Sequence, residues 1–215
     1  TGGLPTARHI LKAAAENATP VVTELGGKSA NIVFADADLD HAAAMAATMG
    51  CVTHAGQGCL FPTRLLAEDQ IYDALVEKVL GYVANARIGD PFAPGTTSGP
   101  VISEGAVNRI SAIIDKAKAE GQGRLLTGGG RIGGALSAGY FLHPTVFGDV
   151  DNASPLAQEE IFGPVLSIIR FTGEADAVAK ANDTAYGLAG YVHTRDLGRA
   201  HRVAAALEAG YVGVN

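Results

Sequence analysis

The chain of 215 residues has only two cysteines, no long apolar run and no cluster of basic residues. Cys51 and Cys59 are too few for a disulfide framework, and their spacing is not a metal-ligand pattern. No apolar run reaches the roughly 18 residues that span a bilayer, and the N-terminus lacks the basic and hydrophobic regions of a signal peptide. We therefore expect no metal site and no membrane partner.

The charge is modest and evenly spread. The formal net charge is -6, from 16 basic and 22 acidic residues. Because no basic patch stands out, we expect neither nucleic acid nor an anionic membrane surface as a partner. A hydrophobic content of 47% over 215 residues is typical of one globular domain that buries a substantial core.

One stretch, His54 to Arg64, places a single cysteine among small residues. Nearby glycines let the backbone approach a ligand closely and leave the sulfur of Cys59 uncrowded, as a covalent catalyst requires. The alternative is a small buried packing residue, which is the usual role of a lone cysteine. A thiolate nucleophile must stay reduced, so a reducing compartment such as the cytoplasm is expected.

A second stretch, Thr23 to Ser29, places Glu24 beside two glycines. It lies between two expected strands, one beginning at Pro20 and one covering Ala30 to Phe34. A cysteine and a glutamate in such settings suit a two-stage reaction. The thiolate forms a covalent adduct, and the carboxylate then activates the water that releases it.

These stretches and a third one resemble the three signature blocks of the aldehyde dehydrogenase superfamily, in the same order and at similar spacing. The blocks here are Glu24-Leu25-Gly26-Gly27-Lys28-Ser29, Gly56-Gln57-Gly58-Cys59 and Glu159-Glu160-Ile161-Phe162-Gly163-Pro164-Val165. The resemblance covers the entire chain. It implies an NAD(P)-dependent enzyme that oxidises an aldehyde to a carboxylic acid, with NAD favoured over NADP.

The resemblance also assigns roles to residues. Cys59 becomes the nucleophile that forms a thiohemiacetal and then a thioester, and Glu24 the base for its hydrolysis, with a pKa raised by partial burial. The positions that match the family's cofactor contacts are Thr1, Gly2, Leu25, Gly26, Glu160 and Phe162. Gly3 departs from the family, because serine is usual at that position.

The resemblance further implies that residues 1–215 form the catalytic, cysteine-bearing domain of a longer enzyme. The upstream nucleotide-binding domain, with the second oxyanion donor, and a C-terminal oligomerisation segment are expected to be absent. The full enzyme is expected to be a homodimer or homotetramer. Two alternatives stay open: a coenzyme A-acylating aldehyde dehydrogenase, which Glu24 disfavours, and a non-catalytic scaffold.

The order of predicted elements indicates a three-layer α/β/α domain with a mostly parallel sheet. Helices are predicted from Pro5 to Asn17, His41 to Val52, an Asp69 cap to Val83, a Ser103 cap to Gly121, Ala175 to Ala181 and Asp196 to Ala209. Later strands are predicted at Thr63 to Leu66, Pro144 to Phe147, Val165 to Phe171, Ala189 to His193 and Tyr211 to Val214.

Four features have two interpretations. Asp36 to Asp40 is more typical of a helix start than of a calcium loop. Gly128 to Gly130 is more typical of a turn than of a phosphate-binding loop. His54 is interpreted as structural rather than as a partner of Cys59. Arg64 either stabilises the Cys59 thiolate or forms a structural ion pair.

Overall fold

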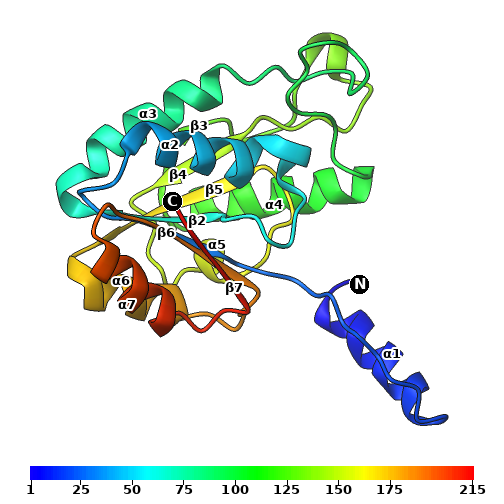
Figure 1. Ribbon diagram of the computed structural model, residues 1–215. Coiled ribbons are helices and arrows are strands. Elements are labelled where there is room, and N and C mark those ends of the chain that lie inside the picture. Colours follow the sequence, from blue (N-terminus) through cyan, green and yellow to red (C-terminus); the bar gives the residue numbers. More distant parts are fainter.

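The computed structural model covers residues 1–215 and is built around one seven-stranded sheet in the order β3-β4-β5-β2-β1-β6-β7 (Figure 1). Neighbouring strands run parallel except β3 and β4, which are antiparallel. The predicted mostly parallel α/β sheet is therefore confirmed. The strands are β1 (Ala30–Val33), β2 (Arg64–Glu68), β3 (Arg124–Thr127), β4 (Thr145–Gly148), β5 (Val165–Phe171), β6 (Ala189–His193) and β7 (Tyr211–Val214).

Helices cover both faces of this sheet, as the three-layer prediction requires (Figure 1). On one face lie α2 (Leu39–Ala47) and α3 (Tyr72–Ala84), and on the other lie α4 (Glu104–Ala119), α6 (Gly173–Asn182) and α7 (Leu197–Ala206). A short α5 (Pro155–Gln158) precedes β5. No helix combines the length and the apolar character needed to cross a bilayer.

The alternation of side chains along the central strands divides the core into two clusters. Ile32 pairs in register with Leu66 and Val192, and all three side chains join the cluster under α4, α6 and α7. The next residue, Val33, points into the cluster under α2 and α3. Because these central strands are buried on both faces, they are mostly apolar along their length.

Several local predictions are confirmed. The Ser103 hydroxyl accepts a hydrogen bond from the Ala106 amide at 3.2 Å and caps α4. Gly121 ends that helical segment with a φ of 64°. The Asp38 carboxylate caps α2, so the acidic run is a helix start, and Gly128 and Gly129 turn the chain after β3 with positive φ.

Three local predictions are wrong. No strand forms at Pro20 to Val22, where Val22 is exposed. Asp69 does not cap α3, because its carboxylate accepts a hydrogen bond from the Thr172 hydroxyl instead. The predicted helix from His41 to Val52 is divided, since α2 ends at Ala47 and a π-helical turn (Thr48–Val52) follows.

The first helix, α1 (Leu4–Ala15), stands apart from the layers (Figure 1). Ala7 is its only buried residue, whereas Leu4, Ile10 and Leu11 are all exposed. Both core clusters are built from residues after Ser29. The packed domain therefore begins near β1, with α1 as an arm beside it.

Candidate active site

The three motif segments meet at one edge of the sheet. Gly27 to Ser29 lead into β1, Cys59 to Thr63 lead into β2, and Phe162 to Pro164 lead into β5. These strands are adjacent and parallel in the order β5-β2-β1, so their amino-terminal ends lie side by side. Sheet topology thus brings the Phe162 segment to the other two, which lie more than about 95 residues before it in the sequence.

Close backbone contacts join the segments. The Gly27 amide donates a hydrogen bond to Oε1 of Glu160 at 2.9 Å. A side chain at Gly27 would meet the carbonyl oxygen of Cys59, and one at Gly56 would meet the carbonyl of Gly163. These glycines are needed because the backbones of three loops touch there.

A cavity of about 220 Å³ opens between these loops and the N-terminal residues. All but one of the predicted site residues line it, together with Gly3. The lining residues are Thr1, Gly2, Gly3, Leu25, Gly26, Cys59, Glu160 and Phe162. The structure therefore brings the predicted nucleophile and the predicted cofactor contacts to one hollow.

Glu24 is the exception. Its side chain is exposed and does not line the cavity, although its carbonyl accepts a hydrogen bond from the Gly2 amide at 3.1 Å. The partial burial predicted for this carboxylate does not occur in the structure, because no residue of the chain covers it. Glu24 lies one residue from Leu25 on the cavity wall.

The loop before Cys59 is held in a strained conformation. After the π-helical turn, His54 and Ala55 have φ values of 50° and 51°, a region that residues with a side chain rarely adopt. The Gln57 amide side chain braces this turn, donating to the His54 carbonyl at 3.1 Å and accepting from the Ile102 amide at 3.0 Å. Such strain and π-helical turns are both frequent at functional sites.

The backbone around Cys59 offers an unused donor. No hydrogen bond within the chain involves the Cys59 amide, and its thiol is partly exposed. A free amide beside a nucleophile can stabilise an oxyanion that forms on the attacked carbonyl.

Cys51 has the opposite environment. It is fully buried, its thiol donates to the Ala47 carbonyl, and burial raises its pKa to about 12. A thiol that stays protonated is a poor nucleophile, so Cys51 is a packing residue. The two cysteines therefore differ in exposure, since Cys51 is buried and Cys59 is partly exposed.

Arg64 is structural, but not through a direct ion pair. Its buried guanidinium donates to the carbonyls of Lys28, Lys180 and Ala181 and to the side chain of Asn152, at 2.8–2.9 Å. All these partners are fixed by the fold. A role for Arg64 beside the Cys59 thiolate is therefore not supported. His54 is exposed, and its ring lies 5.9 Å from that of Phe61.

Lys28 is a feature that the sequence analysis missed. It is 1% exposed, and its Nζ atom has no hydrogen-bond partner. Burial, with the nearby Arg64 charge, lowers its pKa to about 7. The only sign of this burial in the sequence is that Lys28 lies two residues before the buried strand β1.

The cavity residues fit a dinucleotide's nicotinamide end. A side chain at Gly26 would meet the Glu160 carboxylate, so only glycine leaves this wall open. Glu160 supplies a hydrogen-bond acceptor for hydroxyl groups, and Phe162, 42% exposed, supplies an aromatic surface. No cluster of three or more His, Cys, Asp or Glu residues that could hold a metal ion occurs in the structure.

Comparison with known proteins identifies relatives along the entire chain. The model of the aldehyde dehydrogenase family matches residues 1–215. Betaine aldehyde dehydrogenase of Cereibacter sphaeroides is 45% identical over 215 residues, which are 100% of this chain and 44% of that protein. The chain thus spans less than half the length of this curated relative.

Solved structures show the same fold. Betaine aldehyde dehydrogenase from Staphylococcus aureus in complex with NAD+ has a TM-score of 0.94 and 41% identity, over 99% of this chain and 42% of that one. A mutant aldehyde dehydrogenase C from Pseudomonas syringae, in complex with NAD+ and octanal, has a TM-score of 0.92 and 35% identity, over 100% of this chain and 44% of that one. With three motifs around one cavity and a family match over all 215 residues, the chain belongs to the aldehyde dehydrogenase family.

Proposed function

We propose that this chain is the catalytic domain of an NAD-dependent aldehyde dehydrogenase that converts an aldehyde to a carboxylic acid. The observation that carries the proposal is the position of Cys59, partly exposed in a cavity whose other walls are the expected cofactor contacts. Family membership and the NAD+ complexes of similar structures support it.

Cys59 begins the reaction. Its thiolate attacks the aldehyde carbon, a carbon–sulfur bond forms, and the carbonyl oxygen becomes an alkoxide. The Cys59 amide, which makes no other hydrogen bond within the chain, stabilises that charge. A second donor is needed, and the loss of one such donor typically costs about 100-fold to 1,000-fold in rate.

The cavity walls hold the nicotinamide end of the cofactor. When bound, NAD supplies the hydride acceptor for the oxidation step. Glu160, fixed by the Gly27 amide at 2.9 Å, would accept hydrogen bonds from ribose hydroxyls, and Phe162, Leu25 and Gly26 would provide the surface for the ring. Thr1 and Gly2 line the same cavity.

Glu24 completes the reaction. Loss of hydride leaves a thioester on Cys59, and Glu24 accepts a proton from the water that attacks the thioester carbon. The carbon–sulfur bond breaks, the acid leaves, and the thiolate is restored. Because Glu24 is exposed in this structure, we infer that another part of the intact protein covers it.

The relatives are more than twice the length of this chain, which supports the presence of further functional parts in the intact protein. We propose that a nucleotide-binding domain elsewhere holds the adenosine end of NAD and supplies the second oxyanion donor. Assembly into a homodimer or homotetramer belongs to the same proposal. We also propose a cytoplasmic location, because the thiolate that the reaction needs must stay reduced.

The test is NAD reduction by the intact protein with a panel of aldehydes, with and without coenzyme A. Steady turnover without coenzyme A is the expected result. Cys59→Ala should abolish all reduction, whereas Cys51→Ala, the matched control, should retain turnover. Glu24→Gln should give one burst of reduced cofactor per active site and then stop.

Two outcomes would redirect the proposal. Turnover that continues only when coenzyme A is present would indicate the acylating branch and remove Glu24 as the hydrolytic base. No reduction with any aldehyde, together with a Cys59 thiol that resists alkylation in the intact protein, would favour the non-catalytic scaffold.

A further inference from the structure

Helix α4 anchors the third motif segment from outside the cofactor cavity. Arg109, on the second turn of α4, donates a hydrogen bond from its guanidinium to the Ile161 carbonyl at 2.7 Å. The two residues lie 52 positions apart in the sequence, so the fold brings them together. A hydrogen bond from a charged donor is stronger than one between neutral groups. The backbone of the segment is therefore firmly held at Ile161.

The next residue of α4 contacts the same segment. Ile110 is fully buried and belongs to the same core cluster as Ile161. A side chain at Gly163 would meet the Cδ1 atom of Ile110 at 2.5 Å, so only glycine lets the segment lie this close to the helix. Helix α4 thus holds the segment at Ile161 and again at Gly163, on either side of Phe162.

Phe162 is the residue that these contacts fix. Its φ of 48° lies in the left-handed region, and its side chain lines the cofactor cavity. A residue with a side chain keeps such a conformation only where its surroundings impose it. If the Ile161 carbonyl were released, the backbone could rotate toward an ordinary conformation. The aromatic ring would then leave the cavity wall.

Glu160, on the other side of Ile161, is held from a different direction. Its Oε1 atom accepts a hydrogen bond from the Gly27 amide at 2.9 Å, and Gly27 leads into β1. The segment is therefore fixed from β1 through Gly27 and from α4 through Arg109. Arg109 itself does not line the cavity. Any effect of Arg109 on a ligand in the cavity must pass through the segment.

We propose that Arg109 is a positioning residue for the cofactor site. By holding the Ile161 carbonyl, it keeps Phe162 in its left-handed conformation and both Phe162 and Glu160 directed into the cavity. The inference rests on the proposed function, because it assigns to α4 the support of the wall that would receive the nicotinamide end of NAD.

The first test measures NAD binding to the intact protein by calorimetry. Arg109→Met keeps the length of the side chain and removes its donors, so we expect NAD binding to weaken about 10-fold. Arg109→Lys keeps a charged donor and should restore most of the affinity. In turnover assays the loss should appear in KM for NAD and not in kcat. Asn108→Ala, a change at the neighbouring exposed position of α4, is the matched control and should bind NAD as wild type does.

The second test needs no bound cofactor. Hydrogen exchange in the cofactor-free intact protein should be about 10-fold faster at the amides of Glu160 to Gly163 in Arg109→Met than in wild type or Asn108→Ala. Wild-type NAD affinity in Arg109→Met would overturn the inference. Weaker binding with unchanged exchange would also overturn it, because Arg109 would then act on NAD directly. If wild type itself binds no NAD, the proposed function fails, while exchange still decides whether Arg109 holds the segment.

Discussion

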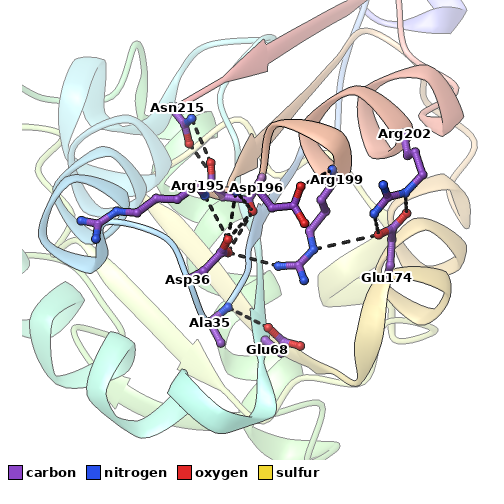
Figure 2. A network of polar contacts seen from close by, with 10 residues as sticks. Ala35, Asp36, Glu68, Glu174, Arg195, Asp196, Arg199, Arg202 and Asn215 are labelled. Carbon is purple, nitrogen blue, oxygen red and sulfur yellow. Dashed lines mark hydrogen bonds and ion pairs between the residues drawn. The ribbon is translucent and has the colours of Figure 1, made fainter.

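The two edges of the central sheet, at the carboxyl and amino-terminal ends of its strands, differ in how their polar groups are paired. At the carboxyl ends of β1, β6 and β7, polar groups are paired with one another. Asp36 accepts hydrogen bonds from the Thr194 hydroxyl. Figure 2 shows that it also accepts from the amides of Arg195 and Asp196 and from the Arg199 guanidinium. Glu174 continues the network by pairing with Arg202 at 2.8 Å.

At the amino-terminal edge, polar groups are left without partners. Of the five buried side-chain atoms that lack a hydrogen bond, four belong to Lys28, Ser29 and Asn31, at the start of β1. The strained Cys59 loop lies at the same edge. Open parallel sheets usually place ligands at the carboxyl ends of their strands. Here the carboxyl edge holds a paired polar network, and the amino-terminal edge carries the candidate site.

The largest expected effect is on kcat/KM for NAD, from a change at the amino-terminal edge of the sheet that leaves the fold intact. Gly26→Ala would place a methyl group against the Glu160 carboxylate and displace it from the Gly27 amide. Because small displacements of binding groups can cost about 100-fold, we expect kcat/KM for NAD to fall by about that factor. The measurement is NAD saturation kinetics together with thermal unfolding.

Gly81→Ala is the matched control, because a side chain there meets no other atom within 4 Å. It lies inside α3, so alanine should stabilise the helix by about 0.5–1 kcal/mol and leave kinetics unchanged. Equal NAD kinetics for Gly26→Ala and wild type would contradict the role given to this wall.

A change at the carboxyl edge should lower stability and leave the kinetics of the folded enzyme unchanged. Asp36→Ala leaves two backbone amides, a hydroxyl and a guanidinium without their common acceptor. We expect the free energy of unfolding to fall by about 3 kcal/mol, with kcat of the folded fraction unchanged. Chemical denaturation and activity below the melting temperature test both parts.

Asp115→Ala serves as the control for removing a carboxylate. It breaks an exposed pair with Lys118, whose side chains are 71% and 44% exposed, and should cost less than about 0.5 kcal/mol. If Asp36→Ala is no worse than this control, the carboxyl edge does not have the stabilising role described.

The unpaired lysine at the site edge should reduce stability. The pKa of Lys28 is lowered from 10.5 to about 7, so between these values the unfolded chain holds a proton that the folded chain has released. Stability from this residue therefore rises with pH across that window. Lys28→Met should stabilise the fold by about 2 kcal/mol at pH 6, and the gain should shrink toward pH 10.

Denaturation curves for wild type and Lys28→Met across pH 6 to 10 test this expectation. Lys118→Met removes an exposed lysine and should show no such trend. Parallel stability profiles for wild type and Lys28→Met would mean that Lys28 remains charged when folded.

The central strands could be predicted because they are buried on both faces. Val165–Phe171 and Ala189–His193 have the predicted bounds and are buried at all but one position. Tyr211–Val214 also has the predicted bounds, although it is only partly buried. Continuous apolar runs specify such strands without help from distant residues. Pro20 to Val22 has the same composition but no strand beside it, so propensity alone was misleading there.

The residues that line the candidate cavity could be predicted from the resemblance, but the surroundings of Glu24 and Lys28 could not. The resemblance selected the cavity residues, yet the exposure of Glu24 and the burial of Lys28 depend on packing between distant segments. A hollow between the α2 region and strands β6 and β7 also could not be foreseen, because these segments lie some 140 residues apart in the sequence.

The smallest expected effect is on stability and comes from the Ser103 cap of α4, which could be predicted from the local sequence alone. Ser103→Ala removes the acceptor for the Ala106 amide at the start of α4 and should lower the free energy of unfolding by about 1 kcal/mol. Ser103→Asp keeps an acceptor near the positive end of the helix and should retain wild-type stability. Neither change touches the cofactor cavity, so NAD kinetics should be unchanged in both. A loss of stability in Ser103→Asp equal to that in Ser103→Ala would show that packing around Ser103, and not the cap, holds this helix start.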